Sequence, residues 1–147
     1  MHLSSARAAK PWPELAQDIA LHYPLAQSVA DYLAGGTMAL PRIAPLANSD
    51  FARRVYRALQ CTELGATVSY GQLAERAGSP GAARAVGRAM AANPLPLLVP
   101  CHRVLAQDGS LGGFTPGLAI KRWLLDHETA LLHRSAALPA PRCRSPQ

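Results

Sequence analysis

The sequence predicts a mainly α-helical fold, in which a winged-helix-like helix-turn-helix is accompanied by short β segments and preceded by a short helical N-terminal segment. Apolar residues recur at helical spacing in several stretches, such as DFARRVYRALQ at residues 50–60. Gly78 separates two predicted helices by a tight turn, which is typical of a helix-turn-helix. At 147 residues, the chain is long enough for one compact domain and a small appended piece, but not for two full domains.

Residues 1–47 are predicted to form the short helical segment and a connector. Apolar side chains recur there in two runs, first Trp12, Leu15, Ala16 and Ile19 and then Leu25, Val29, Tyr32 and Leu33. The glycines of AGG at residues 34–36 end the second run. Prolines interrupt TMALPRIAPLAN at residues 37–48, so this stretch is predicted to be an extended connector.

Residues 48–133 are predicted to be the main domain, beginning with a helix that Ser49 or Asp50 caps. The apolar stripe of this helix is made of Ala52, Val55, Tyr56 and Leu59. A brief β segment is expected at residues 67–69, and a short helix follows it and breaks at Gly78.

The next helix is predicted over residues 80–92, with Ser79 as its N-cap and Pro80 at its first position. It is slim and basic, because alanine and glycine dominate GAARAVGRAMAAN and because Arg84 and Arg88 lie one turn apart. Such a helix suits close approach to a DNA groove. Tight packing inside the protein is the alternative, since helix-turn-helix shapes also occur in proteins that do not bind DNA.

The remaining segments are predicted as a strand, a loop, a helix and a tail. NPLPLLVP at residues 93–100 is predicted to be a turn that feeds a short buried strand. AQDGSLGGFTPG at residues 106–117 is a glycine-rich loop, and the apolar spacing after it indicates a helix that runs to about His133. Residues 134–147, rich in Arg, Pro and Ser, are predicted to be a disordered tail.

The chain is basic, with 15 Lys and Arg against 9 Asp and Glu, a formal charge of +6 and a pI near 9.8. This charge favours an anionic partner, with nucleic acid as the leading candidate and a solvated basic surface as the alternative. The three cysteines form no CxxC pair and no metal-like spacing with histidine, so no metal is expected. No segment approaches the roughly 20 apolar residues that span a bilayer, and a cytoplasmic setting is expected.

Cys101 stands beside a histidine and an arginine in LLVPCHRVLA at residues 97–106. A buried free cysteine is usually an inert, small apolar residue. The neighbouring His102 and Arg103 favour the thiolate, which is the form that acts as a nucleophile. Adjacent side chains of a regular strand point to opposite faces, so cooperation of Cys101 with His102 requires a turn, irregular backbone or a bridging water.

PCHRV and its flanks resemble the active-site signature of the O6-alkylguanine-DNA alkyltransferases, which repair DNA by direct reversal. The stretch that begins with VSYGQLAERAG and ends with WLLDHE follows the C-terminal domain of that family in order, from about Asn48 to Glu128. The resemblance implies that Cys101 irreversibly accepts an alkyl group from the O6 atom of guanine. His102 is then implied to draw the thiol proton through a water, and Glu128 to orient the histidine and stabilise its charge.

The resemblance also implies a partner, which is double-stranded DNA bound through its minor groove by a monomer. Arg84 is implied to fill the gap left by the flipped nucleotide, and Tyr70 to help rotate its 3′ phosphate. The DNA-binding set that the resemblance gives is Tyr70, Ala83, Arg84, Ala91 and Arg103.

The substrate pocket that the resemblance implies includes Asn93, which ties the recognition helix to the active-site segment, together with Val104, Phe114 and Thr115. Phe114 stands where the family commonly has an aromatic hydroxyl donor, and Pro116 where many relatives have glycine, which makes the loop stiffer. No cofactor is implied. The resemblance implies that full-length relatives carry a larger N-terminal α/β domain, and residues 1–47 are expected to be a reduced remnant of it.

Two alternative functions belong to different classes. Alkyltransferase-like proteins bind alkylated DNA and recruit excision repair without transfer, and they typically have tryptophan at the position of Cys101. A winged-helix transcription regulator would explain the charge and the helix-turn-helix. A regulator of this kind leaves Cys101, His102 and Glu128 without a joint purpose.

Overall fold

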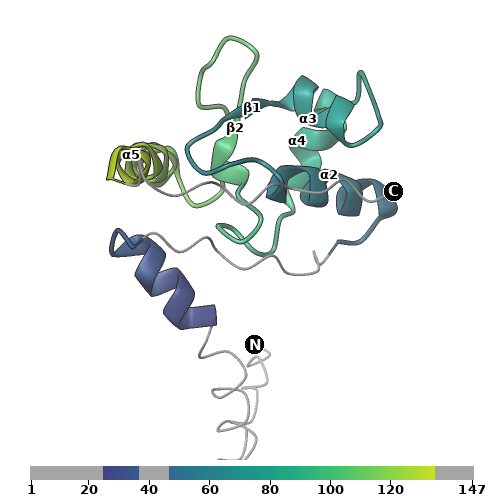
Figure 1. Ribbon diagram of the computed structural model, residues 1–147. Helices are drawn as coiled ribbons and strands as arrows, with labels where there is room; N and C mark the ends of the chain where they lie inside the picture. The colour runs from purple at the N-terminus through teal and green to yellow at the C-terminus, as the bar shows by residue number, and fades with distance from the viewer. Residues whose placement is uncertain (1–24, 37–46, 135–147) are drawn as a thin grey trace, which may run out of the picture. The chain divides into compact units, whose positions relative to one another are not determined.

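The computed structural model describes residues 25–36 and 47–134 (Figure 1). The chain divides into two compact units, residues 1–38 and 39–147. In the first unit, residues 25–33 are helical and Gly35 adopts a φ of 89° just after them, as the second apolar run and the AGG stop predict. The first apolar run, most of the connector and residues 135–147 lie outside the described residues.

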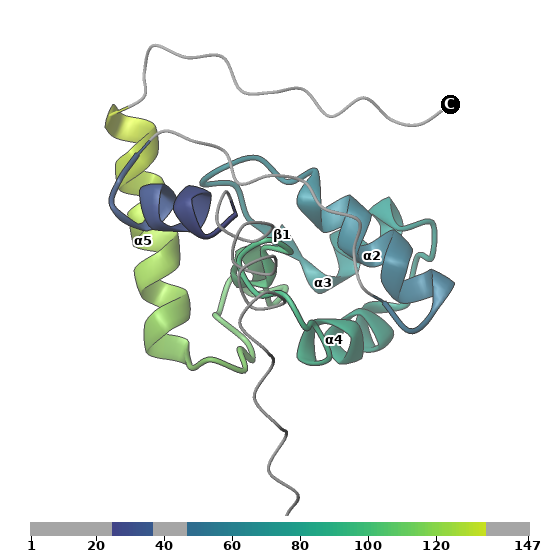
Figure 2. The same ribbon diagram turned by 90° about the horizontal axis from the view of Figure 1, so that it is seen from below.

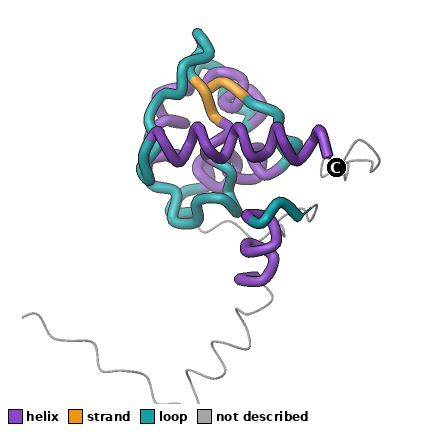
Figure 3. Tube along the Cα trace, turned by 90° about the vertical axis from the view of Figure 1, so that its left-hand side faces the viewer, coloured by secondary structure: helices purple, strands orange, loops and turns teal. Residues whose placement is uncertain are grey.

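Across its described residues, 47–134, the second unit is mainly helical with a small parallel sheet, which confirms the mainly α-helical prediction. Its two strands pair Val68 with Val104 and Ser69 with Leu105, and Figure 3 shows them as a short orange pair among the helices. The elements in chain order are α2 (Asp50–Gln60), β1 (Val68–Ser69), α3 (Tyr70–Arg76), α4 (Ala83–Ala91), the 3₁₀ turn η1 (Cys101–Arg103), β2 (Val104–Leu105) and α5 (Leu118–Arg134).

Helix α2 follows the sequence prediction closely. The Ser49 hydroxyl accepts a hydrogen bond from the backbone N–H of Ala52, which caps the helix. Three of the four predicted stripe residues are buried, namely Val55, Tyr56 and Leu59. The stripe therefore faces the core.

Helix α3 begins with a capping box between Ser69 and Gln72, and the chain turns after it at Gly78, which has a φ of 72°, before α4. Helix α4 begins at Ala83 and not at Pro80, so the predicted start is wrong. Gly81 adopts a φ of 82°, which a right-handed helix does not allow. The Ser79 hydroxyl accepts from Arg54 and makes no cap.

The core of this unit lies between α2, α3 and α4, which pack side by side in Figure 2. Buried Val55, Leu59, Leu73 and Val86 fill it. The buried Tyr56 hydroxyl donates to the backbone oxygen of Ala89 over 2.7 Å, which fixes α2 to the carboxyl-terminal part of α4.

The segment before Cys101 is not the predicted buried strand. Its prolines lack the N–H groups that a strand pairs, and Leu97 adopts a φ of 81°, which is outside strand geometry. A single bridge joins Pro96 and Val99, and the chain then enters η1. Cys101 and His102 therefore lie on a tight turn, which is one of the arrangements that would allow the predicted cooperation.

Helix α5 agrees with the predicted final helix and buries one face made of Lys121, Leu124, Glu128 and Leu131. This face packs against η1. None of the helices in residues 25–36 and 47–134 is both long and apolar enough to cross a membrane.

Candidate active site

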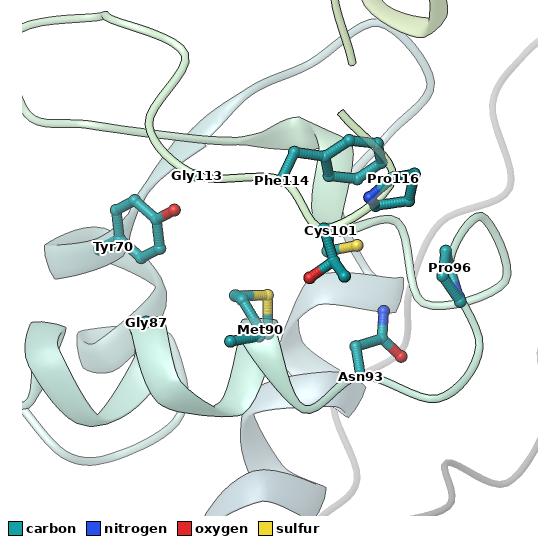
Figure 4. Close-up of a pocket in the computed structure, with 11 residues that line it drawn as sticks. Tyr70, Gly87, Met90, Asn93, Pro96, Cys101, Gly113, Phe114 and Pro116 are labelled. Atoms are coloured by element: carbon teal, nitrogen blue, oxygen red, sulfur yellow. The ribbon is translucent and has the colours of Figure 1, made fainter. Parts of the chain in front are cut away.

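A cavity of about 290 Å³ opens beside Cys101 (Figure 4). In this view Cys101 lies between Phe114 and Pro116 on one side and Met90 and Asn93 on the other. The walls come from α3, α4, the turn after α4, η1 and the loop before α5. The lining residues are Tyr70, Gly87, Met90, Ala91, Asn93, Pro96, Cys101, Gly113, Phe114, Thr115 and Pro116.

Cys101 is a free, buried cysteine that lines this cavity. Burial raises the pKa of its thiol, and a hydrogen bond with the Asn93 side chain and the charge of Lys121 partly oppose that rise. The resting side chain is therefore a thiol, and a base must remove its proton before the sulfur acts as a nucleophile.

His102 is the nearest base in the sequence, and it lies fully buried next to Cys101 on η1. Its Nε2 is 2.7 Å from Oε1 of Glu128, which is also fully buried. An ionised carboxylate only accepts hydrogen bonds, so Nε2 donates to Glu128. In the tautomer that this contact selects for a neutral imidazole, Nδ1 carries the lone pair. Within the described residues, Nδ1 is buried and has no hydrogen-bond partner.

Glu128 stays ionised because its oxygens are surrounded by donors. Arg103 donates to both oxygens over 2.8–3.2 Å, and the backbone N–H of Gly65 donates to Oε2 over 2.9 Å. Burial alone would raise the pKa of Glu128, but the hydrogen bonds from His102 and Arg103 and the charge of Arg103 outweigh it and hold that pKa far below its usual range. A fixed negative charge therefore faces His102.

Arg103 is predicted from the resemblance to contact DNA, and the structure corrects this assignment. Its side chain is buried, and Nη1 donates to the backbone oxygen of Thr62 over 2.5 Å while the other donors bind Glu128. The guanidinium is thus directed into the protein. We assign Arg103 to support of Glu128.

Val104 is predicted in the substrate pocket through its backbone groups, and the structure places it just outside the cavity lining. It lies in β2, is fully buried and does not line the cavity, and its carbonyl oxygen accepts from Nζ of Lys121 over 2.6 Å. The remaining predicted pocket residues, Asn93, Phe114 and Thr115, do line the cavity.

Asn93 ties the end of α4 to the active-site segment, as predicted. Its Nδ2 donates to the carbonyl of Val99 over 3.0 Å, and its Oδ1 accepts from the backbone N–H of Leu95 over 3.0 Å. Both bonds hold the irregular stretch that delivers Cys101.

The predicted DNA-binding residues besides Arg103 fall into two groups. Tyr70 and Ala91 line the cavity, and burial together with the nearby Cys101 raises the pKa of the Tyr70 phenol. Ala83 and Arg84 lie at the start of α4 and do not line the cavity, and the Arg84 side chain is exposed. Arg88, one turn further, is also exposed.

Sequence reasoning missed three residues that support the site. Gly65 donates to Glu128, Thr62 accepts from Arg103, and Lys121 reaches the loop before α5 from the buried face of its helix. Lys121 could have been found, because it lies in register with Leu124, Glu128 and Leu131 at spacings of three and four residues. Within residues 25–36 and 47–134, no group of three or more His, Cys, Asp or Glu is placed to hold a metal ion.

Comparisons with known proteins agree with this geometry. Residues 50–130 match the family model described as 6-O-methylguanine DNA methyltransferase, DNA binding domain. A methylated-DNA–protein-cysteine methyltransferase of Salmonella typhimurium is 44% identical over 109 residues, which cover 74% of this chain and 64% of that protein. The chain thus matches just under two thirds of the length of this relative.

Two solved structures are similar as well. The Mycobacterium tuberculosis OGT in complex with DNA aligns with a TM-score of 0.68 and 40% identity over 72% of this chain and 66% of that one. S. pombe Atl1, in complex with damaged DNA containing O6-carboxymethylguanine, aligns with a TM-score of 0.50 and 30% identity over 57% of this chain and 80% of that one. Because the family model covers more than half of its residues, the chain belongs to the 6-O-methylguanine DNA methyltransferase family.

Proposed function

We propose that this protein repairs DNA by transferring an alkyl group from the O6 atom of guanine to Cys101, once per molecule. One observation carries the proposal. The buried thiol of Cys101 lines a cavity, and His102 is the next residue in the sequence. Glu128 holds Nε2 of His102, and Nδ1 of this ring has no partner within the described part of the chain. Nucleophile, base and orienting carboxylate are the components that cysteine nucleophiles use.

In the proposed reaction, the thiol proton passes through a bridging water to Nδ1 of His102. The sulfur then attacks the alkyl carbon, a carbon–sulfur bond forms, and the bond between that carbon and O6 breaks. The electron pair remains on guanine and is neutralised by a proton, which matches the proton that His102 has gained. Glu128 stabilises the imidazolium during the step. The product thioether is stable, so the protein is consumed.

The walls of the cavity fit a purine with a small alkyl group. Met90, Pro96, Phe114 and Pro116 supply apolar surface beside the sulfur. Phe114 has no hydroxyl, so the phenol that faces the cavity is that of Tyr70. We assign Tyr70 as the aromatic donor available to the bound base, in addition to its proposed role at the 3′ phosphate.

We propose that α3 and α4 form the helix-turn-helix of a winged-helix-like domain that binds double-stranded DNA as a monomer. Helix α4 would enter the minor groove, where Ala83 and Ala91 permit close approach and Arg84 fills the place of the flipped nucleotide. The exposure of Arg84 and Arg88 on α4 and the DNA complex of the Mycobacterium tuberculosis relative support this arrangement. The O6 atom of guanine cannot be reached while the base is stacked in the duplex, so the base must rotate out of the duplex.

The direct test measures repaired guanine. A duplex whose single O6-methylguanine blocks a restriction site is incubated with rising amounts of protein, and the cleavable fraction is scored. We expect one guanine to be restored per protein molecule, with none restored by Cys101→Ala, which should still bind the duplex. Unrepaired duplex in the presence of excess folded wild-type protein would contradict the proposal.

A second candidate function is lesion binding without transfer, and the alignment with the S. pombe Atl1 complex favours it over transcription regulation. In that case the wild-type chain and Cys101→Ala would bind the methylated duplex equally well and more tightly than an unmodified duplex, and neither would restore guanine. Equal affinity for modified and unmodified DNA, with no repair, would instead agree with a transcription regulator.

A further inference from the structure

Lys121 is a fully buried lysine that the proposed reaction does not use. It lies on the inner face of α5, and its Nζ donates to the carbonyl oxygens of Val104, Leu111 and Gly113. Among the described residues, Lys121 forms no ion pair. The buried carboxylate of Glu128 is paired with His102 and Arg103. A buried ammonium with carbonyl partners alone is costly to maintain, which points to a role at this position.

The three carbonyls belong to two separate parts of the site. Val104 directly follows η1, whereas Leu111 and Gly113 belong to the loop that leads to Phe114 in the cavity wall. The Lys121 Nζ also lies 5.9 Å from the centre of the Phe114 ring. One ammonium group therefore fastens the cavity wall to the segment that carries the nucleophile.

The same loop has little freedom on its other side. Gly112 adopts a φ of 62°, and a Cβ atom at this position would lie 3.2 Å from the Tyr70 hydroxyl oxygen. The loop thus runs between Tyr70 and Lys121, and both neighbours define where Phe114 stands.

The charge of Lys121 also acts on Cys101. Burial lowers the pKa of Lys121, and the Cys101 charge opposes that shift, while Lys121 in turn lowers the pKa of the thiol. The other titratable groups that face Cys101 are Tyr56 from α2, Tyr70 from α3 and the adjacent His102. Both phenols have raised pKa values and stay neutral at neutral pH, and Arg103 is paired with Glu128.

We propose that Lys121 is a positioning residue that fastens the cavity wall to the active-site segment and, by its charge, favours the thiolate of Cys101. The inference rests on the proposed function in one respect, that Cys101 is the nucleophile. Lys121 acts through Cys101 and the loop and makes no contact with the reacting bond.

The test measures the rate at which iodoacetamide alkylates Cys101 across a range of pH, with peptide mass analysis to isolate that cysteine and with no DNA present. Lys121→Met removes the charge with little change in volume. We expect its rate curve to move to higher pH, so that alkylation near neutral pH is about tenfold slower, which corresponds to one unit of pKa. Lys121→Arg keeps the charge and should retain most of the rate. The matched control is Arg122→Met, which removes the same charge from an exposed neighbour on α5 and should leave the curve unchanged.

Amide hydrogen exchange of residues 111–113 tests whether Lys121 holds the cavity-wall loop in place. We expect faster exchange in Lys121→Met, and an intermediate rate in Lys121→Gln, because the amide keeps donor hydrogens and lacks the charge. A role that is only structural would loosen the loop and leave the pH curve in place. A folded Lys121→Met variant with the wild-type curve would overturn the proposal.

A measurement on the wild-type chain covers the case in which these variants do not fold. The ¹³Cε resonance of Lys121 should shift as Cys101 ionises, and this inflection should be missing in Cys101→Ser. A resonance with no such inflection in the wild-type protein would overturn the charge interaction. The iodoacetamide and resonance readouts need no DNA, so failure of guanine repair would refute the proposed function and leave this inference standing, and the converse also holds.

Discussion

Glu128 is the residue on which the buried polar contacts of the site converge. It binds the side chains of His102 and Arg103 and the backbone of Gly65, and these partners all donate. Removing one member of such a buried set leaves another charge without a partner, which costs about 3–5 kcal/mol in comparable cases. A substitution of Glu128 is therefore expected to affect both the stability of the fold and the proposed reaction.

Glu128→Gln should slow alkyl transfer by about a hundredfold or more, because His102 loses the carboxylate that orients it and general-base catalysis contributes about that much. It should also change how stability depends on pH. Because the pKa of Glu128 is lowered in the folded protein, its contribution to stability is full above the unfolded pKa of about 4.3 and is lost as pH falls below it. The melting temperature of the wild type should therefore fall more steeply on acidification than that of Glu128→Gln.

Thermal unfolding measured by circular dichroism at several acidic pH values checks this expectation. Glu75→Gln, at an exposed position of α3, is the matched control and should run parallel to the wild type. Parallel curves for Glu128→Gln as well would show that the carboxylate is not held ionised by the fold.

A substitution at Thr62 is expected to stabilise the protein. Its hydroxyl is buried and has no hydrogen-bond partner within the described residues, whereas its backbone oxygen binds Arg103. Thr62→Val keeps the shape and the backbone contact and removes the unpaired hydroxyl. We expect a gain of about 1 kcal/mol in the free energy of unfolding, measured by urea denaturation. Thr62→Ser keeps the hydroxyl and should show no gain, and a destabilised valine variant would reveal an unrecognised partner of the hydroxyl.

At the scale of elements, the turn before β1 and helix α5 meet at Gly65. This glycine has a φ of 72°, and a Cβ atom there would lie 2.3 Å from Cδ1 of Leu132. Gly78 has the same φ, but a Cβ atom on it would meet nothing within 4 Å. Substitutions at these two glycines therefore distinguish the cost of backbone strain, which both positions share, from the cost of a steric clash, which only Gly65 adds.

Gly78→Ala should destabilise the protein by about 1 kcal/mol, which is the cost of a left-handed conformation for a residue with a side chain. Gly65→Ala should cost clearly more, because Leu132 must move and because Gly65 also holds Glu128. Urea denaturation of both variants measures the difference. Equal losses would mean that Leu132 yields without cost.

Helix α4 carries the predicted DNA contacts, and its two arginines form a matched pair. Arg84→Ala should slow transfer from duplex DNA by about tenfold or more, because the wedge that offsets the few kcal/mol of unstacking is lost. Transfer from free O6-methylguanine should stay unchanged. Arg88→Ala removes the same charge one turn away and should affect both substrates little, so a similar loss in both variants would point to charge alone.

Several of these elements could be predicted from local sequence signals. Ser49 and Gly78 mark the ends of helices because capping and left-handed turns depend on a few neighbouring residues. Ser79 and Pro80 carry the same kind of signal, but Gly81 turns the chain and delays α4 by three residues.

Some residues of the site could likewise be predicted from the sequence, and others could not. Cys101 and His102 stand out in the sequence itself, and Glu128 is identified through the family resemblance. Lys121 is missed and Arg103 misplaced, because charged side chains are usually exposed and their burial depends on distant partners.

At the scale of the whole molecule, the chain combines a basic net charge with a small cavity. The formal charge of +6 favours DNA of any sequence and so supports a search for rare lesions. In the proposed function, the cavity beside Cys101 then selects the base. In this proposal, recognition by charge and selection by the cavity are separate steps, and only the second would leave a covalent mark.

Covalent modification of the chain would show directly whether Cys101 is the acceptor. The purified full-length chain is incubated with an equimolar duplex containing one O6-methylguanine, and its intact mass and tryptic peptides are determined. We expect the gain of a single methyl group, located on Cys101. A methyl group on another residue, or an unmodified chain that still binds the methylated duplex selectively, would contradict it.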